Sequence, residues 1–103
     1  MKMSVQLIIS EHSRVEVSKE QVYSELQGEA VILDIKSGVY YGLNQVGASV
    51  WNLIQVPKTV KEIQAALLLE YDVEPEICDR EVRVLLEDLA AKGLINIHND
   101  APV

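Results

Sequence analysis

The sequence predicts an α+β fold in which a three-stranded antiparallel sheet precedes a winged helix-turn-helix. From residue 22 to residue 43, short apolar and β-branched stretches are separated by tight turns, which is typical of strands. From residue 44 the apolar residues recur at helical spacing in three segments, and a short apolar strand follows at Leu94–Ile97. Three short helices followed by a strand have the order of a winged helix-turn-helix. A chain of 103 residues fits one domain, which we place at residues 1–103.

Three short strands are expected in the first half of the chain. The first is Val22–Leu26, and a two-residue turn connects it to the second, Glu29–Ile35, which is rich in β-branched residues. A second turn ends at Gly38, which can supply the positive φ that short turns often require. The third strand is then Val39–Leu43. Because both connections are tight, we expect the strands to form an antiparallel meander.

Capping residues mark the first two helices. Asn44 is a favourable N-cap, and Pro57 ends the helix that it begins. Thr59 and Glu62 have the spacing of a capping box, which begins the second helix. We interpret Trp51 as a core residue between the helices and the sheet. The expected apolar faces are Val46, Val50, Leu53 and Ile54 in the first helix, and Val60, Ile63, Ala66, Leu67 and Tyr71 in the second.

The third helix is expected to begin at Pro75 and to end before Gly93, which suits the first position beyond a helix. Its apolar residues recur at helical spacing, and we interpret Leu85 among them as structural. They are Cys78, Val82, Leu85, Leu86 and Leu89.

The two ends of the chain carry weaker patterns. Residues 1–21 remain poorly assigned, although apolar residues alternate there in two short stretches that would suit strands. These are Val5, Leu7 and Ile9, and then Val15 and Val17. We expect the tail, residues 99–103, to be frayed.

The charge balance disfavours nucleic acid as a partner. The chain has 16 acidic and 9 basic residues, and an acidic surface repels phosphate. From Pro75 to Lys92 there are five acids and three bases, and Leu94–Ile97 contains no Lys or Arg. A winged-helix DNA-binding transcriptional regulator is therefore the alternative function rather than the favoured one.

No pattern of catalytic or ligand-binding residues is evident, so we expect neither an enzyme nor a cofactor or metal site. Cys78 is the only cysteine and lies on an apolar helical face, where a free thiol is usually a small buried hydrophobe. His12 and His98 have no metal-ligand spacing with it. The lone cysteine favours a reducing compartment, and no apolar stretch suits a signal peptide or a membrane span. We therefore expect a cytoplasmic protein without a membrane partner.

Several short motifs in residues 30–95 resemble those of the PqqD family. Together they cover about two-thirds of the chain, whereas the first twenty residues match no family pattern. The motifs, in chain order, are VILD at residues 31–34, GVYYGLN at 38–44, GASVW at 47–51, TVKEI at 59–63, EYDV at 70–73 and KGLI at 92–95.

The resemblance implies a RiPP recognition element, a non-catalytic domain that binds the leader region of a ribosomally synthesised precursor peptide. Such a domain delivers the precursor to a modifying enzyme. A standalone chain of this size is similar to the proteins of lasso-peptide pathways, which serve a leader peptidase. It is also similar to those that work with radical-SAM enzymes.

The resemblance also implies where the leader binds: as an added strand beside the third strand, packed against the third helix. An exposed strand edge offers unpaired backbone groups, which an extended peptide or a second copy of the chain could satisfy, so the oligomeric state stays open. Side chains alternate along a strand, so either Tyr40 or Tyr41 faces the groove. On the helix, a solvated face with an Arg83–Glu87 ion pair is an equal alternative to peptide binding. The expected peptide-binding residues are Val39, Tyr40, Tyr41, Leu43, Arg80, Arg83, Val84 and Glu87.

Overall fold

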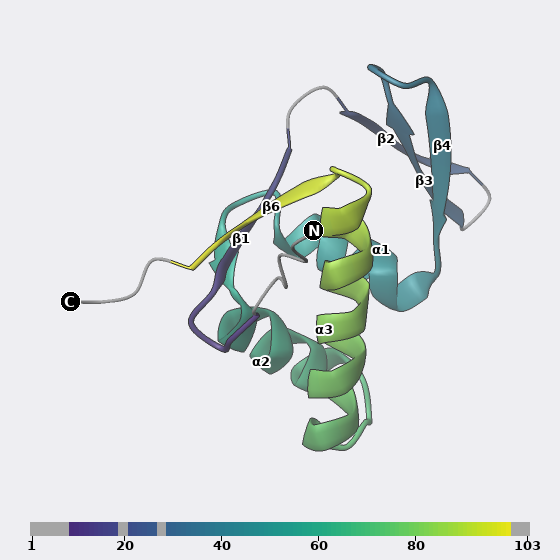
Figure 1. Ribbon diagram of the computed structural model, residues 1–103. Helices are drawn as coiled ribbons and strands as arrows, with labels where there is room; N and C mark the ends of the chain where they lie inside the picture. Colours follow the sequence, from purple (N-terminus) through teal and green to yellow (C-terminus); the bar gives the residue numbers. More distant parts are fainter. Residues whose placement is uncertain (1–8, 19–20, 27–28, 100–103) are drawn as a thin grey trace, which may run out of the picture.

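The computed structural model describes residues 9–18, 21–26 and 29–99, which form two antiparallel sheets and three helices. The first sheet is a meander of β2 (Gln21–Leu26), β3 (Glu29–Asp34) and β4 (Val39–Leu43), in the order β2-β3-β4. It stands to one side of the helices (Figure 1). Gly38, with φ of 72°, closes the turn between β3 and β4, as the sequence predicted.

The second sheet collects strands from distant parts of the chain. Its order is β5-β1-β6, with β1 at Arg14–Val17, β5 at Lys58–Thr59 and β6 at Ile95–His98. The sequence predicted only one three-stranded sheet, so this second sheet is an addition to the expected fold. β1 confirms the strand pattern at Val15 and Val17, and β6 begins one residue later than expected.

The three helices begin where their caps predicted. They are α1 (Gln45–Leu53), α2 (Val60–Glu70) and α3 (Pro75–Ala91). The side chain of Asn44 accepts a hydrogen bond from the Gly47 amide, and Thr59 and Glu62 form the full capping box. Gly93 follows α3 with φ of 75°. None of these helices, in the part of the chain that is described, is long and apolar enough to cross a membrane.

The core lies between the helices and the second sheet. Trp51 is 2% exposed, which confirms its predicted place in the core. Leu85 is only half-buried, so its position is partly superficial. Fully buried side chains come from every helix and from both sheets, and include Val15, Ile32, Val50, Ile54, Val60, Ile63, Leu86 and Leu94.

The first sheet joins this core through one face. α1 contacts β3 and β4, and the residues on that side are Ala30 and Ile32 in β3 and Tyr41 and Leu43 in β4. Tyr40 is on the opposite face and is 69% exposed. The first sheet is therefore anchored on one side only.

Two expectations concern the ends of the chain. Of the alternating residues in the first stretch, Val5 and Leu7 lie outside the described residues, whereas Ile9 is buried but belongs to no strand. Asn99 is not frayed, because its side chain accepts a hydrogen bond from the buried Ser13 hydroxyl. The rest of the expected tail, residues 100–103, lies outside the described residues, as does the turn at residues 27–28.

Candidate functional site

The outer edge of β4 is open within the described part of the chain. β4 pairs with β3 on one side, from Asp34 opposite Val39 to Ala30 opposite Leu43, and it is the last strand of its sheet. On the other side, no strand of residues 9–18, 21–26 or 29–99 pairs with its backbone N–H and C=O groups. Such an edge is a ready template for another extended chain.

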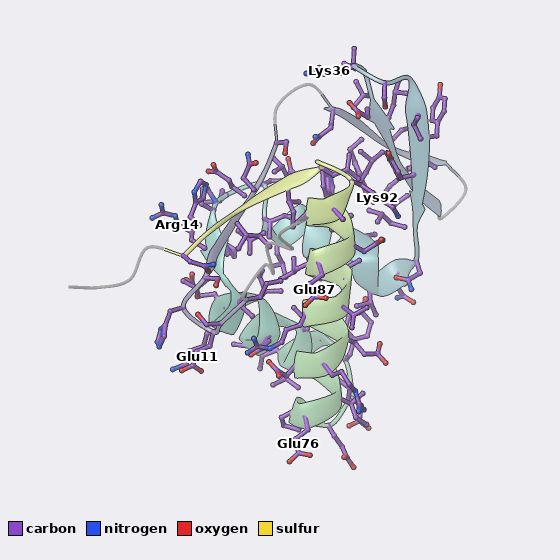
Figure 2. All side chains as sticks on the ribbon, in the orientation of Figure 1. Glu11, Arg14, Lys36, Glu76, Glu87 and Lys92 are labelled. Atoms are coloured by element: carbon purple, nitrogen blue, oxygen red, sulfur yellow. The ribbon has the colours of Figure 1, made fainter. Side chains whose placement is uncertain are left out.

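The register of β4 decides which tyrosine faces the helices. Tyr41 lies opposite the buried Ile32 and packs against the core, whereas Tyr40 lies opposite Leu33 on the far face. The Lys92 ammonium lies 5.2 Å from the centre of the Tyr41 ring, which is within cation–π range. Figure 2 shows Lys92 at the end of α3 next to the first sheet and Glu76 at the other end. Tyr41 is therefore the tyrosine on the side of α3.

A hollow between the beginning of α1 and the middle of α3 starts where β4 ends. It has a volume of about 610 Å³, and we call it the α1–α3 hollow. Asn44, the residue after β4, forms one wall together with the first turn of α1. The α1–α3 hollow is lined by Asn44, Val46, Gly47, Arg80, Glu81, Val84, Leu85 and Asp88.

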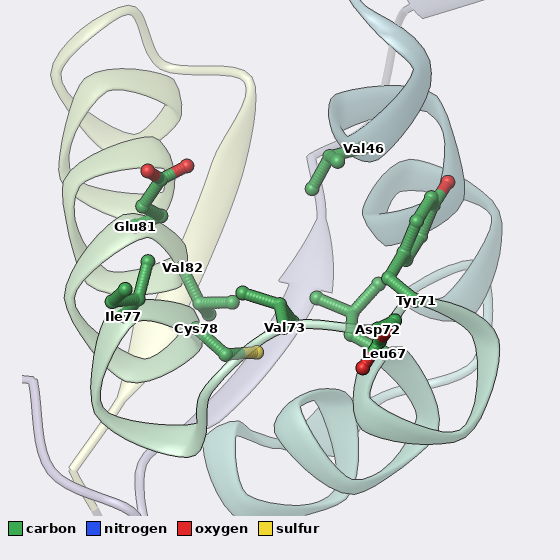
Figure 3. Close-up of a pocket in the computed structure, with 9 residues that line it drawn as sticks. All are labelled: Val46, Leu67, Tyr71, Asp72, Val73, Ile77, Cys78, Glu81 and Val82. Carbon is green, nitrogen blue, oxygen red and sulfur yellow. The ribbon is translucent and has the colours of Figure 1, made fainter.

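A second, smaller recess lies between the end of α2 and the beginning of α3 (Figure 3). We call it the α2–α3 pocket, and its volume is about 280 Å³. Val46 and Glu81 line both the hollow and the pocket, so the two are neighbours along α3. The pocket is lined by Val46, Leu67, Tyr71, Asp72, Val73, Ile77, Cys78, Glu81 and Val82.

α3 carries the four helical residues that the sequence assigned to the site, and the structure divides them between two sides. Arg80 and Val84 line the α1–α3 hollow, and the Val84 side chain is 60% exposed. Neither Arg83 nor Glu87 lines it. Residues four apart lie on one helical stripe, so Asp88 joins Arg80 and Val84. That spacing was the signal by which sequence reasoning could have found Asp88.

Arg83 is held by contacts within the protein. Its Nε lies 2.9 Å from Oδ1 of Asp79, and its Nη1 donates a hydrogen bond to the backbone carbonyl of Ile9. The side chain of Gln64 on α2 donates a hydrogen bond to the same carboxylate. The structure thus pairs Arg83 with Asp79, one turn before it, rather than with the Glu87 of the sequence hypothesis. This side of α3 is fastened to α2 and to the N-terminal segment.

The charges around the hollow are mixed. Lys92 and Asp88 form an ion pair of 2.8 Å, whereas Glu81 has no ion-pair partner among the described residues. Arg80 is exposed and lines the same hollow. The Arg80 guanidinium and the Glu81 carboxylate are therefore the groups in the hollow that can pair with charges on a ligand beside the open edge of β4.

Cys78 does not have the surroundings of a nucleophile. Its side chain is 5% exposed, and burial, with smaller contributions from the carboxylates of Asp79 and Glu81, raises the pKa of the thiol. Since the thiolate is the reactive form, a raised pKa makes the thiol weakly reactive at neutral pH. Within residues 9–18, 21–26 and 29–99 no group of three or more His, Cys, Asp or Glu is placed to hold a metal ion.

Comparison with known proteins places this arrangement in a family. The family model described as "Coenzyme PQQ synthesis protein D (PqqD)" matches residues 29–95. A search of curated protein sequences found no match.

Three solved structures share the fold. TbiB1 in complex with the TbiA(beta) leader peptide is 32% identical with a TM-score of 0.72, over 84% of this chain and 99% of that one. Lasso peptide synthetase B1, complexed with the leader peptide, is 23% identical with a TM-score of 0.72, over 80% and 96%. The PqqD part of Methylobacterium extorquens PqqCD, described as a functional, stand-alone RiPP recognition element, is 20% identical with a TM-score of 0.73, over 86% and 95%.

Proposed function

The chain belongs to the PqqD family, and from this premise we propose that it is a non-catalytic peptide chaperone. It binds the leader region of a ribosomally synthesised precursor peptide by β-strand addition to β4. It then delivers the precursor to a modifying enzyme or a leader peptidase. The observation that carries the proposal is the open edge of β4 beside the α1–α3 hollow, in a chain 32% identical to a protein solved with a leader peptide.

The geometry supports strand addition because backbone and side-chain recognition lie next to each other. Hydrogen bonds to the β4 edge would give affinity with little dependence on sequence. The side chains of an added strand alternate between the two faces, so every second one lies on the same face as Tyr41 and Leu43. That face is the side of α3, where the hollow can accept the side chains and provide selectivity.

The geometry supports a narrower set of residues for the proposed site. Val39, Tyr40, Tyr41 and Leu43 contribute the backbone of the edge. Tyr41 and Leu43 add side chains on the side of the helices. On α3, Arg80 and Val84 are the proposed contacts, whereas Arg83 and Glu87 lie outside the hollow.

The helices and the second sheet act as a scaffold that positions the proposed peptide site. We infer that α1, α2 and α3 with β1 and β6 correspond to a winged helix-turn-helix, in which α3 follows α2 after a short linker. A DNA reader would present cations from α3, but this helix carries more acids than bases. The same architecture instead presents Arg80 and Val84 to the end of β4, which favours a peptide over a nucleic acid.

A direct binding measurement tests the proposal. The probe is a synthetic, fluorescently labelled leader, which is the N-terminal segment of a precursor peptide to be sought among short open reading frames beside the gene of this chain. Fluorescence anisotropy should give a dissociation constant in the micromolar range or tighter. A folded sample that does not bind this probe at high micromolar concentration would refute the proposal.

Two controls separate chaperone from enzyme. The mass of the precursor should be unchanged after incubation with this chain alone, and it should change only when the partner enzyme, a leader peptidase or a radical-SAM enzyme, is added. A processed precursor in the absence of the partner would contradict the non-catalytic role.

A further inference from the structure

The α2–α3 pocket is apolar inside and charged at its rim. Leu67 and Val82, which face each other from α2 and α3, are each 2% exposed, and Val73 of the linker lies between the helices. Ile77, 36% exposed, lies at the rim. Pockets for whole drug-sized ligands measure about 300–1,000 Å³. The volume of about 280 Å³ lies at the lower end of this range and leaves room for one large side chain.

The pocket continues the path of the proposed leader. An added strand that keeps the antiparallel order of the sheet runs from the Leu43 end of β4 to the Val39 end. The leader residues that precede the paired segment then lie beside Asn44, where the α1–α3 hollow begins. From there Val46 and Glu81 lead directly into the α2–α3 pocket.

The rim charges restrict what can approach. Asp72 and Glu81 both line the pocket, and Glu70 and Glu74 are exposed on either side of the linker. Among the described residues no Lys or Arg lines the pocket. A segment with a Lys or Arg next to its apolar residue is electrostatically favoured, and one with Asp or Glu there is repelled.

On the basis of the proposed function, we propose that the α2–α3 pocket is a second anchor for the leader. It takes one apolar side chain, with a basic residue beside it, from the part of the leader that precedes the strand paired with β4. The leader is thus held at two places, by its backbone at β4 and by this side chain between α2 and α3. Apolar anchors in such pockets commonly dominate the energy of a peptide interface.

The test combines a filled pocket with a scanned leader. Ile77→Trp places a large side chain at the rim of the pocket, and the control Leu69→Trp adds the same side chain on α2 at a residue that is 92% exposed. Binding of the synthetic leader should weaken about tenfold with Ile77→Trp and stay unchanged with Leu69→Trp. Melting curves should show that both variants are folded.

Alanine substitutions in the leader identify the anchor. Changing one apolar leader residue before the paired segment to Ala should weaken leader binding to the parent protein about tenfold. The same change should not weaken binding to the Ile77→Trp variant any further. This lack of additivity is the expected signature of a shared contact. Additive losses would overturn the proposal, because they would place the leader residue elsewhere.

The single cysteine gives a measurement that needs no variant. Cys78 lines the pocket, and because its buried thiol reacts slowly at neutral pH, the reaction with a small thiol reagent is followed at alkaline pH, where the complete leader should slow it further. A leader that starts at the paired segment should bind but not protect. Suppose that the complete leader binds tightly, that Ile77→Trp does not weaken this binding, and that the leader does not slow the reaction of Cys78. The second anchor is then wrong, while the proposed function stands. If no leader binds at all, the proposed function fails and the anchor fails with it.

Discussion

Each of the two sheets has three strands within the described residues, but they differ in how much of their surface is buried. The second sheet, β5-β1-β6, joins strands from both ends and the middle of the chain, and Val15 in its central strand is completely buried. The first sheet, β2-β3-β4, is local in sequence, and Val22, Val39 and Tyr40 on it are 48%, 43% and 69% exposed. One sheet therefore closes the core, whereas the other leaves the outer edge of β4, where the leader is proposed to add, unpaired by any described strand.

The largest expected effect is on the core side of this comparison. Trp51→Ala should lower the free energy of unfolding by about 3–5 kcal/mol, because it removes a large buried side chain and leaves a cavity. Tyr40→Ala, on the exposed face of the first sheet, should change stability by less than about 0.5 kcal/mol. Chemical denaturation measures both. Equal losses would mean that the first sheet is as much a part of the core as α1.

A proline scan tests whether the edge of β4 works through its backbone. Outward and inward N–H groups alternate along an edge strand, so Tyr40→Pro and Tyr41→Pro should differ. One should reduce leader affinity about tenfold to a hundredfold while the fold is kept, since an unpaired backbone group costs about 1–3 kcal/mol. The other should lower the melting temperature by breaking the pairing with β3. Anisotropy measures the leader affinity of both variants, and melting curves measure their stability. If the two variants have the same leader affinity and melting temperature, strand addition at this edge is contradicted.

Val84→Asp should separate binding from stability. Val84 is 60% exposed in the free protein, so its stability should change by less than about 0.5 kcal/mol. In the complex the new carboxylate would be desolvated without a partner, and leader affinity should fall about tenfold or more. The matched control is Leu69→Asp, which alters an exposed leucine away from the hollow. A Val84→Asp protein that binds as well as the control would place the leader elsewhere.

The two arginines of α3 provide a finer contrast. If a leader carboxylate lies beside Arg80, Arg80→Glu should weaken leader binding several-fold, and the loss should shrink as salt is raised, because screening reduces the repulsion. Arg83→Glu should instead lower stability by about 1 kcal/mol, since it loses the ion pair with Asp79. It should have little effect on leader affinity. The opposite result would move the site to the other side of α3.

The smallest expected effect is a pH dependence at the start of α2. The Thr59 amide donates a hydrogen bond of 2.9 Å to the Glu62 carboxylate, and this bond lowers the pKa of Glu62. The stabilisation is complete above the pKa of Glu62 in the unfolded chain, and it is lost as the pH falls through the lower folded-state pKa. Glu62→Gln should therefore make the melting temperature less sensitive to pH on the acidic side. Identical acid profiles for the two proteins would contradict this role.

The elements that the sequence predicted well are those set by neighbouring residues. The turn at Gly38 and the caps at Asn44 and Thr59 depend on backbone geometry and on hydrogen bonds within four residues, so their signals are local. The second sheet was missed because β5 has only two residues and pairs with a strand more than forty residues away. No pattern within such a short stretch distinguishes a strand from a loop.

The candidate site divides in the same way. The sequence determined by itself that β4 is a short aromatic strand and that Arg80, Arg83, Val84 and Glu87 lie outside the most buried stripe of α3. It could not determine which of these residues meet the end of β4, because Arg80 and Arg83 have the same chemistry and differ only in direction around the helix. The rotation of α3 is decided by tertiary packing. Cys78, Val82, Leu86 and Leu89 face the core, the Arg83–Asp79 pair turns toward Ile9, and Arg80 and Val84 are left beside the open strand.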